Sequence, residues 1–117
     1  MNPLNPAFMP AVKMARIRLN ELLIKAKVSK FVYPSKHFVE RAVERNLAVD
    51  DVFYMLAPVI REFRNSTYNE RVIGVHYRQN TLVTQFKTGC VSNERKIILK
   101  TVYDKNNSQI YDAEIKL

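Results

Sequence analysis

Residues 71–86 read RVIGVHYRQNTLVTQF, and this stretch decides the fold class. Its two halves are rich in β-branched and aromatic residues, and the short polar run RQN between them is typical of a β-hairpin. Another β-branched run, RKIILKTVY at residues 95–103, follows, and residues 108–117 are expected to form a last edge strand. The segments before the hairpin have helical spacing. We therefore expect an α+β domain in which two to three N-terminal helices pack on one face of a four- to five-stranded antiparallel sheet.

The first segments of the chain differ in their helical potential. Residues 1–10 carry three prolines and are expected to form an extended arm. Residues 11–28, AVKMARIRLNELLIKAKV, place apolar side chains on one broad face of a helix and basic side chains largely elsewhere. Glu21 is the one acidic residue of this segment. The sequence therefore predicts an amphipathic, basic helix, which we expect to pack on the domain with its basic face in solvent.

Two further helices are expected before the hairpin. Ser35 is a good N-cap for a helix that ends near Asn46. Asp50 is expected to cap a third, short helix that ends before Pro58, because proline lacks the amide hydrogen that a helix interior needs. After Pro58 we expect strands, the first of them at VIREF, residues 59–63.

The composition narrows the class of protein. A chain of 117 residues, of which 47% are hydrophobic, suits one compact domain. The net charge of +8 indicates a polyanionic partner, and nucleic acid is the commonest polyanion that a small basic protein meets. The alternative is that the charge serves only solubility. No apolar run approaches the ~18 residues of a membrane span, so we expect no membrane partner.

Cys90 is the only cysteine of the chain. A single cysteine excludes an intramolecular disulfide and a zinc site built from cysteines. A lone thiol fits the reducing cytoplasm, and the first ten residues lack the basic start of a signal peptide. We interpret Cys90 as a small residue near a strand end, the alternative being a nucleophile.

Residues 33–46, YPSKHFVERAVERN, contain the first candidate site. On a helix, His37, Arg41 and Glu44 share one face, and Arg45 lies beside them. The positive end of the helix dipole and the two arginines disfavour an imidazolium, so we expect a neutral imidazole that can act as a general base. A face of this composition is most often only solvated, and that alternative stays open.

The second histidine, His76, lies in the expected hairpin. Strand alternation separates it from Ile73 and Val75, which have the character of a core face, so His76 is expected on the open face of the sheet. The pattern of residues 95–103 does not settle which of its two alternations shares that face. The candidate contacts to RNA phosphates or bases are Arg45, Arg71, Arg78, Lys87, Lys100 and Tyr103.

These residues suggest one kind of chemistry. RNA is cleaved by its own 2′-hydroxyl when a base removes the 2′ proton, an acid protonates the leaving 5′ oxygen, and cations stabilise the phosphorane. His37 and His76 are candidates for the base and the acid, and Arg41 and Arg45 for the cations. Since these groups require neither a metal nor a cofactor, we expect none.

Part of the chain resembles a known family. Residues 26–56, AKVSKFVYPSKHFVERAVERNLAVDDVFYML, resemble the RegB family of phage early-message endoribonucleases. The similar pattern is Ser-x-His, two apolar residues, x-Arg-Ala, an apolar residue and x-Arg, at residues 35–45. GVHYRQNTL at residues 74–82 is a second similar segment. A related group of small bacterial domains has a similar His-x3-Arg-x3-Arg helix and a closing strand like ILKTVYD, residues 98–104. The resemblance covers about residues 20–103.

The resemblance implies a RelE- and YoeB-like RNase domain over residues 11–117. It implies metal-independent cleavage of mRNA or other cellular RNA to a 2′,3′-cyclic phosphate, in a phage-borne or toxin-like protein of the bacterial cytoplasm. A ribosome or a ribosomal protein is the implied activator. His37 takes the place of the family's catalytic histidine, and Arg41 that of the following arginine. The family's second histidine is replaced by Ala57, and His76 lies where a carboxylate is expected.

Two functions follow from these observations. The first is an endoribonuclease with His37 and His76 as acid and base. The alternative is a non-catalytic module of the same fold, which binds RNA or inhibits a host protein through the basic first helix and the face of Arg41 and Arg45. The absent family histidine keeps the alternative open.

Overall fold

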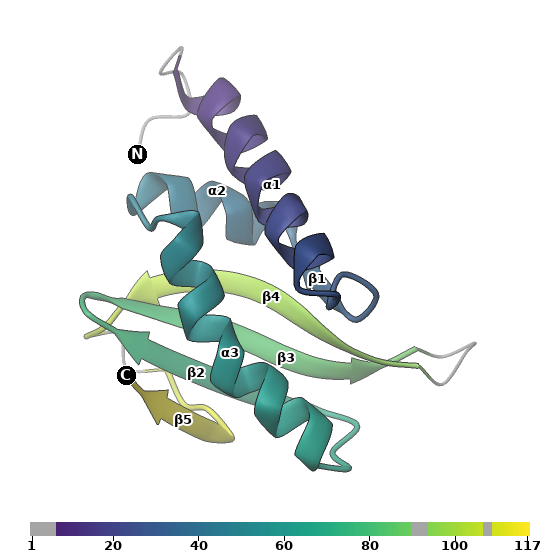
Figure 1. Ribbon diagram of the computed structural model, residues 1–117. Coiled ribbons are helices and arrows are strands. Elements are labelled where there is room, and N and C mark those ends of the chain that lie inside the picture. The colour runs from purple at the N-terminus through teal and green to yellow at the C-terminus, as the bar shows by residue number, and fades with distance from the viewer. Residues whose placement is uncertain (1–6, 90–93, 107–108) are drawn as a thin grey trace.

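The computed structural model describes residues 7–89, 94–106 and 109–117. These residues form three helices and one five-stranded sheet, in which the strand order is β1-β4-β3-β2-β5 (Figure 1). The elements along the chain are α1 (Phe8–Lys25), β1 (Val32–Pro34), α2 (Lys36–Glu44), α3 (Val49–Asn65), β2 (Arg71–Tyr77), β3 (Asn80–Thr88), β4 (Arg95–Asp104) and β5 (Ala113–Lys116). The expected α+β class is confirmed.

The sheet is mixed, so the expectation of a wholly antiparallel sheet is wrong at both edges. The central strands β2, β3 and β4 are antiparallel neighbours, whereas β1 pairs in parallel with β4 and β5 in parallel with β2. Parallel neighbours need long crossover connections. Two helices and the central hairpin separate β1 from β4, and the chain crosses from one side of the sheet to the other between β4 and β5.

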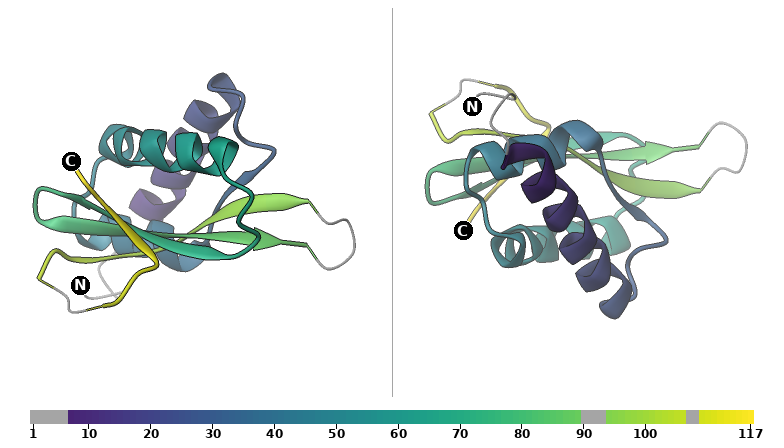
Figure 2. Two further views of the ribbon diagram at one scale, coloured as in Figure 1. Left: turned by 90° about the horizontal axis from the view of Figure 1, so that it is seen from below. Right: turned by 90° about the horizontal axis from the view of Figure 1, so that it is seen from above.

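The helices cover one face of the sheet in two layers. α2 and α3 pack on the strands, and α1 lies over both of them as an outer layer (Figures 1 and 2). The core between helices and sheet includes Phe38, Leu56, Ile73, Phe86 and Leu99, each at most 1% exposed. Burial of this apolar surface is the main term that holds the layers together.

α3 is longer than the sequence predicts. It begins at Val49 and runs through Pro58 to Asn65, so the helix does not end before the proline and residues 59–63 do not form a strand. Val59 and Phe63 are buried against the sheet at 0% and 8% exposure. This packing outweighs the one backbone hydrogen bond that the proline removes.

α1 begins earlier than the sequence predicts. It starts at Phe8, so the extended arm expected over residues 1–10 does not include residues 8–10. Pro10 lies in the first turn, where an amide hydrogen has no partner within the helix. Pro3, Pro6 and Cys90 lie outside the described residues. Within the described part of the chain, we find no helix that is both long enough and apolar enough to cross a membrane.

Candidate active site on the open face of the sheet

A β-bulge decides which side chains of β4 reach the open face, the face away from the helices. Val83 is paired with Thr101, but the next residue of β3, Thr84, is paired with Leu99, so Lys100 is an extra residue. Such an insertion shifts the alternation by one residue. Lys96 and Ile98 therefore share the open face with Thr101 and Tyr103, a combination that neither simple alternation of this strand contains.

The bulge aligns a row of polar side chains across four strands. Lys116 of β5 is paired with His76 of β2, His76 with Thr81 of β3, and Thr81 with Tyr103 of β4. Residues paired in this way lie side by side on the same face. His76 is thus on the open face, as the sequence predicts, and its neighbours come from three other strands.

Both ring nitrogens of His76 have a partner. Nδ1 lies 2.8 Å from Oγ1 of Thr81, and Nε2 lies 2.7 Å from Oε1 of Glu114. Because a hydroxyl can donate or accept a hydrogen bond, Thr81 can pair with Nδ1 whether the imidazole is neutral or protonated. The side chain of His76 is 12% exposed and that of Glu114 is 50% exposed. The pair therefore has one largely buried member and one member open to a ligand.

The connection between β4 and β5 covers part of the open face. The ring of Tyr111 lies over Gly74, and a Cβ at that position would come within 2.8 Å of the ring. The same ring meets His76 edge to face, at 6.2 Å between centroids. Asp112 fixes the segment, because its backbone N–H donates to the carbonyl of Val72 and its carboxylate accepts from the N–H of Val72. The absence of a side chain at Gly74 is thus what lets Tyr111 reach His76.

The hydroxyl of Tyr111 is buried without a hydrogen-bond partner among the described residues. Burial raises the pKa of this phenol, and the neighbouring Tyr103 and Glu114 raise it further. The phenol therefore stays neutral beside the pair of His76 and Glu114.

A cavity of about 360 Å³ opens beside the pair. It is lined by His76, Glu114, Lys105, Lys116 and the C-terminal Leu117. The lining thus combines two lysines and a histidine with the side-chain carboxylate of Glu114. This arrangement can bind a phosphate, and it places a proton donor and a proton acceptor next to that phosphate.

A second cavity, of about 350 Å³, lies between α2 and the end of β4. Arg41, Arg45, Tyr103 and Asp104 are among its lining residues. Tyr103 also belongs to the row that contains His76, so the two cavities flank the same strand end. The structure therefore brings the two predicted arginines to the border of the open face.

Both arginines of this second cavity are partly neutralised. Nη1 of Arg41 lies 2.6 Å from Glu44, and Arg45 donates to Asn80 at 2.7 Å and to Asp104 at 3.2 Å. The pKa of Asp104 is lowered, chiefly by the backbone N–H of Asn106 and also by Arg45. Arg45 therefore ties α2 to the start of β3 and the end of β4, in addition to lining the cavity.

His37 is placed differently from His76. It lies on the exposed first turn of α2, which Ser35 caps by accepting a hydrogen bond from the N–H of Phe38. Within residues 7–89, 94–106 and 109–117, His37 has no hydrogen bond or ion pair. Among the residues that the structure describes, His76 therefore has a carboxylate partner and His37 has none.

The other predicted contact residues are not among those that line the histidine cavity. Arg71 is at the far end of β2, with its guanidinium 4.1 Å from the ring centroid of Tyr68. Arg78 is in the hairpin turn, at φ 55°, over the ring of Tyr77. Lys100 is the exposed bulge residue.

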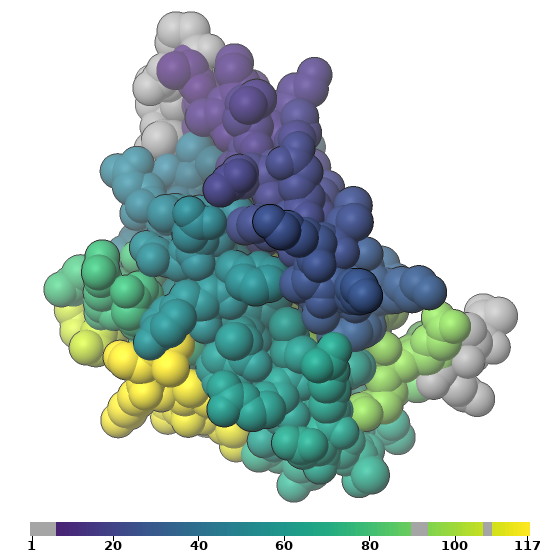
Figure 3. Space-filling view, viewed as in Figure 1, coloured from purple at the N-terminus to yellow at the C-terminus, as the bar shows by residue number. Residues whose placement is uncertain are grey.

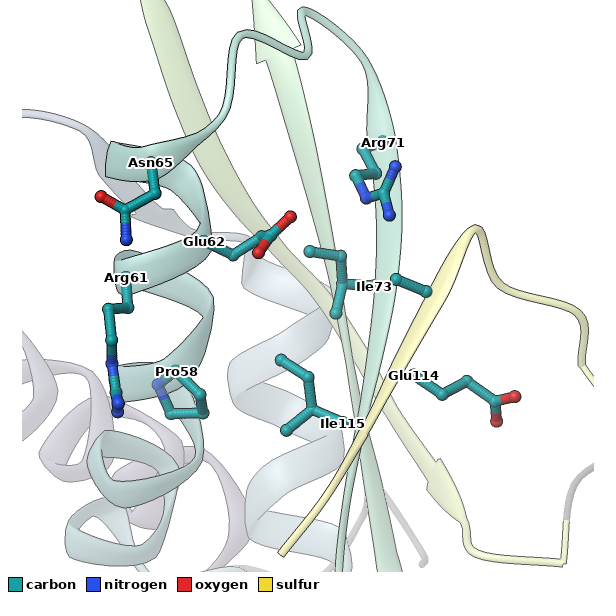
Figure 4. Close-up of a pocket in the computed structure, with 9 residues that line it drawn as sticks. Pro58, Arg61, Glu62, Asn65, Arg71, Ile73, Glu114 and Ile115 are labelled. Atoms are coloured by element: carbon teal, nitrogen blue, oxygen red, sulfur yellow. The ribbon is translucent and has the colours of Figure 1, made fainter.

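A third cavity, of about 410 Å³, separates α3 from β2 and β5 on the helix side of the sheet. Figure 4 shows Arg71 and Glu62 at this cavity, whereas the carboxylate of Glu114 points away from α3. Ile73 and Ile115 line its sheet side. Figure 3 shows the C-terminal segment, coloured yellow, beside the teal atoms of α3. The carboxylate of Glu114 thus lies on the open face, although the residue also borders this third cavity.

The sequence reasoning missed Thr81, Lys105, Tyr111, Glu114 and Lys116. One signal was available, because alternation in AEIK places Glu114 and Lys116 on the face opposite Ala113 and Ile115. No local pattern indicated that this strand would join β2.

No group of three or more His, Cys, Asp or Glu side chains that could hold a metal ion occurs among the described residues. In the comparisons with known proteins, no family model, no curated protein and no solved structure matches this chain.

Proposed function

We propose that this protein is an endoribonuclease that cleaves RNA by internal attack of the 2′-hydroxyl, without needing a metal. The observation that carries the proposal is the 2.7 Å contact between Nε2 of His76 and Oε1 of Glu114, beside Lys105 and Lys116. The net charge of +8 and the resemblance of residues 26–56 to the RegB family support RNA as the substrate.

The proposal gives each group one role. Glu114 removes the proton of the 2′-hydroxyl as the 2′ oxygen forms its bond to phosphorus. The bond from phosphorus to the 5′ oxygen breaks, and the imidazolium of His76 gives its proton to that oxygen. Lys105 and Lys116 stabilise the charge on the phosphorane. The products are a 2′,3′-cyclic phosphate and a 5′-hydroxyl.

The proposal also assigns a function to the surroundings of the pair. In this reaction the attacking and leaving oxygens lie on opposite sides of phosphorus, so the phosphate has to separate Glu114 from His76. Glu114 is half exposed, so its carboxylate has solvent into which it can move, whereas His76 is 12% exposed and is also held by Thr81. Thr81 can keep its hydrogen bond to Nδ1 in both charge states of the ring, so the ring keeps its orientation when it loses its proton.

The proposed catalytic pair differs from the pair His37 and His76 that the sequence suggests. The support for the change is the carboxylate partner of His76 and the exposed position of His37. His37 therefore serves as an internal control.

The test is cleavage of total bacterial RNA in EDTA, with and without ribosomes, by four proteins: the wild type, Glu114→Gln, His76→Ala and His37→Ala. We expect the first two variants to lose at least about 100-fold in rate, the size of a general acid or base effect, and His37→Ala to cleave like the wild type. Full activity in Glu114→Gln would contradict the proposal. Loss in His37→Ala alone would place the catalytic centre on α2.

A non-catalytic module that binds RNA or a host protein is the second candidate. The observation that favours it is that both nitrogens of His76 are already bonded and that Tyr111 covers part of the ring. A binding module would give a salt-sensitive complex with RNA and no new RNA ends.

A further inference from the structure

We propose that the open face has a second RNA contact region at its other end, which binds an unpaired base and its phosphates several nucleotides away from the scissile site. This region, the base platform, consists of Tyr33, Ile98, Lys87 and Lys96. The inference rests on the proposed function, because it concerns the same RNA chain, and it specifies single-stranded RNA as the substrate.

The sheet register places the four residues together. Tyr33 of β1 is paired with Ile98 of β4, so the two side chains lie side by side on the open face. Lys96 is two residues before Ile98 on the same strand, and it is paired with Lys87 of β3. The β3–β4 pair projects beyond the helices at this end of the sheet (Figure 2). Lys87 lies near the end of β3 and Lys96 near the start of β4, so both belong to this projecting pair.

The two lysines form a like-charge pair. Like charges directly opposite each other in a sheet are unfavourable. In the described part of the chain, neither Lys87 nor Lys96 has an ion pair with a carboxylate. The ammonium of Lys96 is instead 5.3 Å from the ring centroid of Tyr33. An anion bound between the two ammonium groups would relieve the repulsion, and an RNA phosphate carries the required charge.

Tyr33 has the properties of a residue that stacks on a base. It is 44% exposed although it lies in a strand of the sheet. Its hydroxyl donates to the carbonyl of Lys30 at 2.9 Å, which fixes the orientation of the ring. An exposed, oriented ring beside an ammonium offers both contacts of one nucleotide, stacking for the base and charge for the phosphate.

The platform and the histidine cavity can contact one RNA chain. From Lys96 to Tyr103, β4 spans roughly 23 Å at ~3.3 Å per residue, a distance that several nucleotides cover. Only an unpaired base can stack on an exposed tyrosine, because the bases of a duplex are already stacked on each other. The two ends of the open face therefore favour a single strand over a duplex.

The test is the binding of fluorescently labelled single-stranded RNA of about ten nucleotides, at several salt concentrations, to the wild type, Tyr33→Leu, Tyr33→Phe and Lys87→Gln. We expect Tyr33→Leu to raise Kd about tenfold and Tyr33→Phe to retain most of the affinity. Lys87→Gln should make the slope of log Kd against log salt concentration smaller, by the amount expected for the loss of about one phosphate contact. Lys25→Gln, which removes one charge from the exposed end of α1, should change neither property. Thermal melting checks that each variant is folded.

Two outcomes would overturn the inference: an unchanged Kd for Tyr33→Leu, or equal losses for single-stranded RNA and for a duplex of the same length. The test is independent of cleavage, because binding is measured directly. If the wild type binds through Tyr33 but cuts nothing, the proposed nuclease activity fails and the platform stands. If it cuts a dinucleotide with unchanged kcat in Tyr33→Leu and the Kd for the longer RNA does not change, the platform fails and the nuclease stands.

Discussion

The carboxylate of Glu114 lies 2.7 Å from Nε2 of His76, although 38 residues separate them in the chain. The two residues are on neighbouring parallel strands, where His76 is paired with Lys116 and Glu114 with Gly74. The contact is thus diagonal across the strand pair. It exists because the chain crosses the sheet after β4 and returns as the edge strand β5.

Replacing Glu114 by glutamine separates its proposed catalytic role from its structural one. Glutamine keeps the shape and can still hydrogen-bond Nε2, but it cannot accept the 2′ proton. We expect a loss of at least about 100-fold in cleavage rate and a change of less than ~1 kcal/mol in the free energy of unfolding, because the residue is half exposed. Rate assays and urea unfolding of one preparation check both expectations. Unfolding of the variant under assay conditions would contradict this assignment.

Substituting alanine for Gly74 tests the cover over His76. The new Cβ would lie 2.8 Å from the ring of Tyr111, closer than carbon atoms pack. The ring has to move, so we expect a loss of about 1–3 kcal/mol in the free energy of unfolding, as for other overpacked sites. Thermal or urea unfolding measures the loss. The double variant Gly74→Ala, Tyr111→Ala should be no less stable than Tyr111→Ala alone, because the ring that clashes is gone. If the losses of the two single variants simply add in the double variant, this contact is not the cause.

The Tyr111→Phe variant is expected to be more stable than the wild type. The hydroxyl is buried without a partner among the described residues, so its removal avoids a desolvation cost of ~1 kcal/mol. The pKa of the phenol is raised, mainly by burial. The folded state thus holds the proton more tightly than the unfolded state, and this stability is lost as the pH rises above the unfolded value of 10.0.

Urea unfolding at pH 7 and at pH 11 tests both parts of this prediction. The advantage of Tyr111→Phe over the wild type should grow at the higher pH. Tyr68→Phe changes an exposed tyrosine and provides the matched control. A wild type that is more stable than Tyr111→Phe at pH 7 would indicate that the hydroxyl has a partner.

The contribution of Asp104 to the stability of the fold depends on pH. Its pKa is lowered, chiefly by the N–H of Asn106 and also by Arg45. The stabilisation is therefore present above the unfolded value of 3.8 and is lost as the pH falls through the lower folded pKa. We expect Asp104→Asn to be less stable than the wild type at pH 6 and to approach it at pH 3. A stability difference that stays constant between these two pH values would exclude the ionisation of Asp104 as its origin.

Pro58→Ala should stabilise the protein. The proline is in the interior of α3, where it removes one backbone hydrogen bond. Alanine restores the donor and has the highest helix propensity, so we expect a gain of ~1 kcal/mol. Thermal unfolding measures the gain, and Ala57→Ser at the exposed neighbouring position is a control for a simple surface change. A lower melting temperature for Pro58→Ala would show that the helix needs the bend that proline imposes.

Local sequence patterns determined the α+β class, the three helices and the position of His76 on the open face. Ser35 is an N-cap whose side chain bonds the backbone three residues later, and alternation of apolar residues in β2 separates core from open face. Both features depend on neighbours in the chain, which is why they could be predicted. The continuation of α3 through Pro58 could not, because it depends on the burial of Val59 and Phe63 against strands that follow later.

Only the tertiary structure decided the candidate site. The bulge at Lys100 changes which side chains of β4 face His76, and a bulge depends on pairing with β3 and not on the residue itself. The parallel pairing of β5 with β2 brings Glu114 to His76 and Lys116 beside it. Strand alternation tells which side chains share a face, but the choice of the neighbouring strand depends on the path of the connection. The sequence therefore determined one member of the proposed catalytic pair, and the crossing of the chain over the sheet decided its partner.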